Sequence, residues 1–263
     1  MYQQLPFVTV SREARNHSSY SPALNANTGE LPGWQYANLL TGEGLKKALE
    51  SVDTVIHLAS GPGKHQQHPV EIVMARELLK AAKETGVTHF IYMSIVGVDR
   101  IPLPYYQAKC HVEEMIKDSG LPFTILRATQ FHEFIDFQIK QLLKWFVAFV
   151  PGHLMFQPIA VDAVAFKLVQ LAQQSPTFNT IEVGGSKTYR LREMVALWQH
   201  VHQQHKKIIH LPAVGAVMKA LAKDYAVSAH PDLTSATWEE YLLEKLEANS
   251  SESYVHAVTR AAQ

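Results

Sequence analysis

The chain has 263 residues, of which 47% are hydrophobic, and its 24 Lys and Arg balance its 24 Asp and Glu. This length and apolar content fit a globular α/β unit with room for a second lobe. A net charge of zero gives no electrostatic reason to expect nucleic acid or an anionic membrane as a partner. The single cysteine, Cys110, excludes an internal disulfide and favours a reducing cytoplasm.

No targeting or membrane-spanning segment is expected. The first six residues, Met-Tyr-Gln-Gln-Leu-Pro, lack both the charged start and the apolar run of a signal peptide. The most apolar stretch, 145–150, is too short to cross a bilayer. The sequence therefore predicts a soluble, cytoplasmic protein.

The first half of the chain alternates short apolar runs with amphipathic segments. Strands are expected over 7–10, 34–39, 54–59, 89–93 and 123–127, and helices over 44–51, 69–85 and 105–120. Gly86 and Gly120 stand where the second and third helices should stop. Strands that alternate with helices predict a parallel sheet with right-handed crossovers.

The second half has a less regular pattern. The run 131–150 is apolar and aromatic with few turn signals, which predicts a helical flap over a pocket. The remaining expected elements are helices over 161–173, 191–202, 214–223 and 238–246 and strands over 180–183 and 208–211.

Tyr105 and Lys109 stand one helical turn apart, after the strand that ends at Ser94. At positions i and i+4 their side chains share one face of the helix. An ammonium favours the ionised form of a neighbouring phenol, so we expect Lys109 to lower the pKa of Tyr105 toward the range of a working acid or base. The alternative is an exposed helix face, because Tyr-x-x-x-Lys is common by chance.

Five short motifs follow one another between residues 35 and 245. They are 55–59 (Val-Ile-His-Leu-Ala), the strand ending at Ser94, 104–109 (Pro-Tyr-Tyr-Gln-Ala-Lys), 125–129 (Ile-Leu-Arg-Ala-Thr) and 161–165 (Val-Asp-Ala-Val-Ala). In this order the segments resemble the short-chain dehydrogenase/reductase superfamily, and more narrowly its atypical, NmrA-like NAD(P)H-binding members.

The resemblance implies an α/β fold with a Rossmann-like doubly wound parallel sheet. It places an NAD(P)-binding core at 1–127 and a smaller substrate-side lobe, interleaved with the last strands of the sheet, at 128–263. The implied function is that of an NAD(P)H-dependent oxidoreductase, which transfers a hydride between nicotinamide and a small carbonyl, enone or imine. Tyr105 would supply the proton, Lys109 would orient the ribose, and Ser94 would polarise the acceptor.

Ser94 departs from the family pattern. Extended members carry the catalytic Ser or Thr one residue later, where this chain has Ile95. A strand-end hydroxyl bonded to the backbone is therefore an equal alternative for Ser94.

The resemblance also implies contacts with the cofactor. Arg12 follows the second strand of the family, where a basic residue accepts the 2′-phosphate of NADP, so NADP is expected rather than NAD. The alternative for Arg12 is a solvated basic loop. The other residues placed at the cofactor are Asn38, Ala59, Ser60, Gly61, Lys109 and Thr129.

The front of the chain lacks a family feature. The first glycine is Gly29, so no glycine-rich turn follows a first strand, and 7–12 matches the second strand of the family. The run 61–66 (Gly-Pro-Gly-Lys-His-Gln) imitates such a turn, but its proline offers no N–H to a phosphate. A missing first strand would leave two inner sheet edges unpaired, at about 1–3 kcal/mol for each buried group. The missing first strand has three possible explanations: a misassigned start, a truncated gene, or another segment that fills the gap. We favour the first two.

Two other kinds of function also fit the sequence. One is a non-catalytic NADP(H)-sensing or protein-interaction module, and the other is an inactive remnant. No metal site is expected, because the histidines near residues 200–210 have no carboxylate or cysteine to complete a ligand set. The expected partner is a small-molecule substrate, and the sequence carries no signal of oligomeric state.

Overall fold

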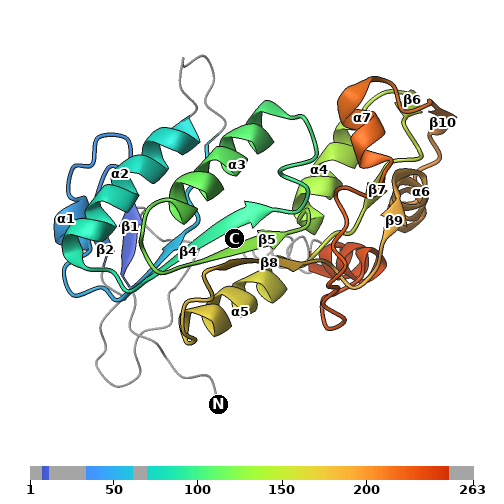
Figure 1. Cartoon of the computed structure of the whole chain (residues 1–263). Coiled ribbons are helices and arrows are strands. Elements are labelled where there is room, and N and C mark those ends of the chain that lie inside the picture. Colours follow the sequence, from blue (N-terminus) through green and yellow to red (C-terminus); the bar gives the residue numbers. More distant parts are fainter. Residues whose placement is uncertain (1–7, 12–33, 62–69, 249–263) are drawn as a thin grey trace, which may run out of the picture.

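The computed structural model describes residues 8–11, 34–61 and 70–248 (Figure 1). The elements follow in chain order as β1 (Thr9–Ser11), β2 (Trp34–Tyr36), α1 (Leu45–Ala48), β3 (Thr54–His57), α2 (Val70–Thr85), β4 (His89–Ile95), α3 (Pro104–Lys117), β5 (Phe123–Ala128), α4 (His132–Leu142), β6 (Val147–Val150), β7 (Met155–Phe156), α5 (Val161–Ala172), β8 (Asn179–Val183), β9 (Tyr189–Arg190), α6 (Leu191–Val201), β10 (Lys207–His210) and α7 (Gly215–Leu221). A last helix begins at Trp238 and continues to residue 248.

The central sheet has four strands in the order β3-β4-β5-β8, and all of them run parallel. Helices α2 and α3 cover one face and α5 covers the other, while α1 lies beside α2 near the β1–β2 pair (Figure 1). The middle strands β4 and β5 are buried along most of their length, as expected for parallel strands with helices on both faces. The predicted α/β fold with a Rossmann-like parallel sheet is confirmed.

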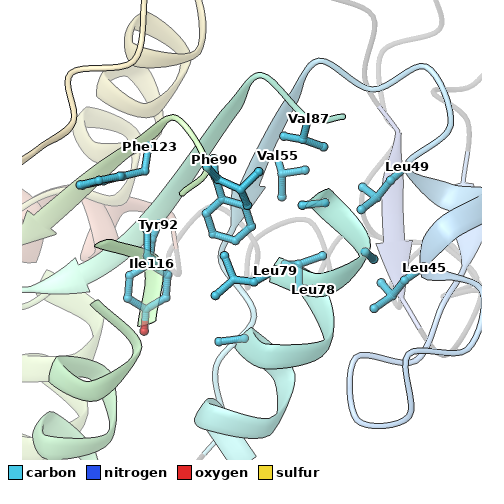
Figure 2. Packing of buried hydrophobic residues seen from close by; sticks show 14 of the residues in the cluster. Leu45, Leu49, Val55, Leu78, Leu79, Val87, Phe90, Tyr92, Ile116 and Phe123 are labelled. Atoms are coloured by element: carbon cyan, nitrogen blue, oxygen red, sulfur yellow. The ribbon is translucent and has the colours of Figure 1, made fainter. Parts of the chain in front are cut away.

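The larger part of the core lies between the sheet and α1–α3. Figure 2 shows Val55 of β3 and Phe90 of β4 packed against Leu78 and Leu79 of α2. Burying a side chain of this size stabilises the fold by about 1.5–3 kcal/mol. A second cluster, around Ile91 and the inner face of α5, fills the opposite side.

The predicted end of α2 at Thr85 is confirmed, and α3 ends at Lys117, shortly before the predicted stop at Gly120. Gly86 and Gly120 have φ angles of 78° and 76°, the left-handed conformation that suits glycine after a helix. Pro104 occupies the first turn of α3, where its missing N–H costs no helical hydrogen bond.

β1 and β2 form a parallel pair of their own. Within the described ranges, no strand is hydrogen-bonded between β1 and β3, and the outer edge of β3 has no ladder partner there. The two strands that flank this position therefore belong to separate sheets.

The prediction of one helix over 131–150 is wrong in its second half. Helix α4 ends at Leu142, and β6 follows after a turn. Val147 and Phe149 are exposed while Ala148 and Val150 are buried, which is the alternation of a half-buried strand. The continuous apolar composition concealed this alternation, and the pairing partner β10 lies far away in the sequence.

The remaining segments form a lobe at one end of the sheet (Figure 1). Its core combines α4, β6, α6 and the last helix around Trp198 and Trp238. The lobe closes against the sheet at Gly97, whose φ is 79° and where an added methyl group would overlap the carbonyl oxygen of Tyr225. No described helix is long and apolar enough to cross a bilayer.

Candidate functional site

The site lies where β3 and β4 end and α3 begins. Tyr105 and Lys109 both point from α3 toward this edge, and the Lys109 ammonium lies 5.6 Å from the centre of the Tyr105 ring. Tyr105 is half-buried and Lys109 is buried. The structure thus brings together the two residues that the sequence placed one helical turn apart.

The Tyr105 hydroxyl forms a short hydrogen bond with the hydroxyl of Ser60, just after β3. The Ser60 hydroxyl also donates to Oε2 of Glu71 at 3.2 Å, and the Gly61 N–H donates to the same oxygen at 3.3 Å. A phenol, an alcohol and a carboxylate therefore form one chain from the edge of the sheet into the protein.

Lys109 is held by three acceptors. Its Nζ lies 2.9 Å from Oε1 of Glu71, 3.2 Å from the Tyr92 hydroxyl and 3.0 Å from the carbonyl oxygen of Met93. An ammonium has three protons to donate, so this set uses all of them. In this arrangement Lys109 has no proton left for a ribose hydroxyl.

Glu71 connects both halves of this group, and the sequence reasoning did not find it. It lies in the first turn of α2, and its side chain is buried. A carboxylate there interacts favourably with the helix N-terminus. The sequence did contain a signal for Glu71, because its helical spacing places it in one stripe with Met74, Ala75 and Leu78. A charge in an otherwise apolar stripe requires a buried cation as its partner.

The expected depression of the Tyr105 pKa is wrong for this arrangement. Burial raises the pKa of Tyr105 above its ordinary value, the Glu71 carboxylate raises it further, and the bond to Ser60 opposes the shift. The Lys109 charge is balanced by Glu71, which explains why it does not stabilise the phenolate.

Ser94 is not brought to this group. It is buried, and its hydroxyl donates to Oε1 of Glu113 at 2.5 Å. Glu113 also receives two hydrogen bonds from Arg127, at 2.9 and 2.7 Å. Strand side chains alternate between faces, so Ser94 points like Tyr92 toward the helices α2 and α3. Ile95, one residue later, packs against the apolar cluster that Tyr105 also contacts. The one-residue departure from the family pattern therefore puts an apolar side chain, and not a hydroxyl, in the Tyr105 cluster.

Thr129 has local partners as well. Its hydroxyl donates to the carbonyl oxygen of Gln157 and accepts from the Gly185 N–H at 3.3 Å. These bonds join the end of β5 to two loops of the lobe. The side-chain oxygen of Asn38 accepts from the Leu40 N–H at 3.0 Å, which closes a turn after β2.

Two of the expected cofactor contacts follow β3 directly. Ala59 is partly exposed, and Gly61 is uncrowded, since an added Cβ would meet only a Val70 methyl carbon at 3.6 Å. Arg12 lies outside the described residues, as does most of the run 61–66.

A buried histidine stands behind the site. His57 of β3 stacks on Tyr92 with ring centroids 5.4 Å apart, and its Nε2 has no hydrogen-bond partner among the described residues. Burial lowers the pKa of His57 to about 4, so the imidazole is neutral at physiological pH.

Two cavities lie elsewhere. One of about 320 Å³ is next to the outer side of α3, and one of about 670 Å³ lies between α5, β8 and the segment 230–234. Neither is lined by Tyr105 or Ser60. Among the described residues, no group of three or more His, Cys, Asp or Glu side chains could hold a metal ion.

Comparison with known proteins identifies the nucleotide-binding part of the chain. Residues 19–139 match the family model for NAD(P)H-binding proteins. This match confirms the expected cofactor class. The chain is also 23% identical over 246 residues to the photosystem II assembly factor Ycf39 of Guillardia theta, covering 84% of this chain and 78% of that protein. It is 22% identical to Ycf39 of Cyanophora paradoxa, covering 67% of this chain and 57% of that protein.

Solved structures confirm the fold. The NADPH-dependent quinone oxidoreductase QOR2 of Escherichia coli, complexed with NADPH, superposes with a TM-score of 0.70 at 18% identity, covering 91% of this chain and 90% of that chain. A nucleoside-diphosphate-sugar epimerase of Staphylococcus aureus superposes with the same TM-score at 15% identity, covering 90% of each chain. Because a reductase and an epimerase match equally well, the likeness establishes the fold and leaves the reaction to be argued from the site.

Proposed function

We propose that this protein is an NADPH-dependent oxidoreductase that reduces a small carbonyl, enone or imine. The observation that carries the proposal is the Tyr105 hydroxyl, hydrogen-bonded to Ser60 at the carboxyl edge of β3 and β4. Ligands of open parallel sheets bind at this edge. The residues lie in the segment that matches NAD(P)H-binding proteins.

Tyr105 is the proposed proton donor. The bound nicotinamide would supply the hydride, and the phenol would deliver one proton to the substrate atom that gains the charge, so a carbonyl becomes an alcohol. A pKa raised by burial keeps the phenol protonated at neutral pH, which suits the direction of reduction. Because Ser60 donates its one proton to Glu71, the phenol donates to Ser60 here, and a bound substrate would replace Ser60 as the acceptor. Lys109 supports the Tyr105 ring from the buried side.

The residues after β3 fit the nicotinamide end of a cofactor. Ala59, Ser60 and Gly61 bring the main chain to the edge, and the space around Gly61 allows a close approach. We further propose Arg12 at the 2′-phosphate, Asn38 beside the adenine and Thr129 near the nicotinamide. Contact between Lys109 and a ribose would require it to exchange one of its three present partners.

The test measures NADPH binding and NADPH oxidation separately, with a panel of quinones, aldehydes, ketones, enones and imines. Tyr105→Phe should abolish turnover and leave NADPH binding unchanged. Tyr106→Phe is the matched control, because Tyr106 is the adjacent phenol and lies against Gln130 instead of Ser60. Full turnover by Tyr105→Phe would refute the assignment.

A second function is favoured by a specific observation. Lys109 is fully engaged inside the protein, and two relatives are named as assembly factors. A non-catalytic NADP(H)-binding interaction protein would need no free ammonium at the ribose. Binding of NADPH without oxidation across the whole panel would favour this second function.

A further inference from the structure

The end of the lobe exposes a group of large apolar side chains. Trp145 and Phe146, in the turn before β6, are 72% and 91% exposed, and Phe149 of β6 is 56% exposed. Val147 and Ile209 are exposed beside them. We call these five residues the aromatic face. Single exposed apolar residues are ordinary, but a contiguous group of aromatic ones marks a contact surface.

Strand geometry places three of these side chains on one side. β6 and β10 are parallel, with Val147 in register with Lys207 and Phe149 in register with Ile209. Residues in register point to the same side of a sheet, so the outer face of this strand pair carries Val147, Phe149 and Ile209 together. Its inner face, with Ala148 and Val150, packs into the core of the lobe. Figure 1 shows the pair at the end of the molecule opposite β1 and β2.

The two segments that carry the aromatic face are basic. The segments 137–152 and 203–211 contain no Asp or Glu. Of their lysines, Lys140 pairs with Asp136 at 2.9 Å, and the others are Lys144, Lys206 and Lys207. The Lys206 ammonium lies 5.6 Å from the centre of the Phe146 ring, so the basic and aromatic groups are direct neighbours. Lys207 stands on the same side of the strand pair as Val147.

We propose that the aromatic face binds the surface of an anionic lipid bilayer. Trp and Phe side chains on a protruding turn insert at the boundary between headgroups and acyl chains, and lysines beside them attract anionic headgroups. A second copy of the chain fits less well, because a two-fold contact would bring like charges of the two copies together. An acidic protein remains the competing occupant and is separated by the test. The proposal stands independently of the proposed reaction.

The test uses the full chain and sedimentation with vesicles of phosphatidylcholine, with or without phosphatidylglycerol. Binding is expected to the anionic vesicles, to weaken with added salt, and to be weak with phosphatidylcholine alone. The double variant Trp145→Ser/Phe146→Ser should reduce the apparent affinity about tenfold or more, and Lys206→Glu/Lys207→Glu should do the same. The matched control is Leu233→Ser, an exposed apolar residue outside the aromatic face.

A second readout is independent of sedimentation. The emission of Trp145, taken as the difference between wild type and Trp145→Phe, should shift to shorter wavelength on addition of anionic vesicles. A folded protein that fails to bind anionic vesicles would overturn the proposal, as would binding that the Trp145/Phe146 double variant leaves unchanged. A dimer that this variant dissociates, in the absence of vesicle binding, would assign the aromatic face to a second copy. Capture by an acidic polypeptide without vesicle binding would assign it to a protein.

Discussion

Replacing Lys109 with methionine should cost a large part of the stability of this protein. The substitution keeps the length and most of the volume of the side chain and removes the charge. Among the described residues, it leaves the Glu71 carboxylate, which is 1% exposed, with the Tyr92, Ser60 and Gly61 donors. A buried charge that loses its partner destabilises a protein by about 3–5 kcal/mol. Against a total stability of about 5–15 kcal/mol, this is about a fifth or more of the total.

The chain contains a matched control for the effect of burial. Lys46 and Glu84 also join two helices, with Nζ and Oε2 3.0 Å apart, compared with 2.9 Å between Lys109 and Glu71. Their side chains are 69% and 39% exposed, compared with 6% and 1% for the buried pair. An exposed pair contributes about 0–1 kcal/mol, so Lys46→Met should be nearly neutral.

Urea denaturation followed by circular dichroism measures both losses. The double variant Glu71→Gln/Lys109→Met removes both charges and should regain about 2 kcal/mol or more relative to Lys109→Met alone. If Lys109→Met costs no more than Lys46→Met, the view of Glu71 and Lys109 as a buried ion pair that organises the site is refuted.

Three further outcomes are expected. His57 binds a proton at a pKa near 6.5 in the unfolded state and only near 4 in the folded state. The free energy of unfolding should therefore fall by up to about 3 kcal/mol as the pH drops from above 6.5 to 4. His57→Phe should flatten this loss, as measured by urea denaturation at each pH. Gly97→Ala should lower the melting temperature far more than Gly86→Ala: both glycines have φ near 80°, but a methyl group has free space only at position 86. Ser94→Ala should cost about 1–3 kcal/mol, by leaving Glu113 one donor short, while any NADPH oxidation stays unchanged; a selective loss of turnover would instead restore Ser94 to the site.

Local signals in the sequence were sufficient for most of the fold. The helices α2 and α3 follow from apolar stripes that end at Gly86 and Gly120, and both signals lie within a few residues of the structure they predict. Strand β6 could not be found in this way. Its alternation is hidden in an apolar run, and its partner β10 is contributed by a segment about 60 residues later.

The site shows the same division between local and distant information. Tyr105 and Lys109 are neighbours on one helix, so their common face could be derived from spacing alone. Ser60 and Glu71 come from the end of another strand and the start of another helix, and only the packing of α2 against α3 brings them to Lys109. The rise in the Tyr105 pKa comes first from burial, and the unseen carboxylate adds to it. The error therefore lay in the unseen burial of the phenol and in the missing partner of Lys109, and not in the rule that a neighbouring cation stabilises a phenolate.

The balance of charge over the whole chain also concealed a local imbalance. Equal numbers of basic and acidic residues gave no reason to expect an anionic surface as a partner. Net charge is a sum over all faces, whereas a surface contact depends on the charges within about a Debye length, about 10 Å at moderate salt. In the segments 137–152 and 203–211, Lys140 pairs with Asp136, whereas Lys206 and Lys207 lie beside Phe146 and Val147 of the aromatic face. A contact surface of this kind can be recognised only when the register of β6 and β10 is known.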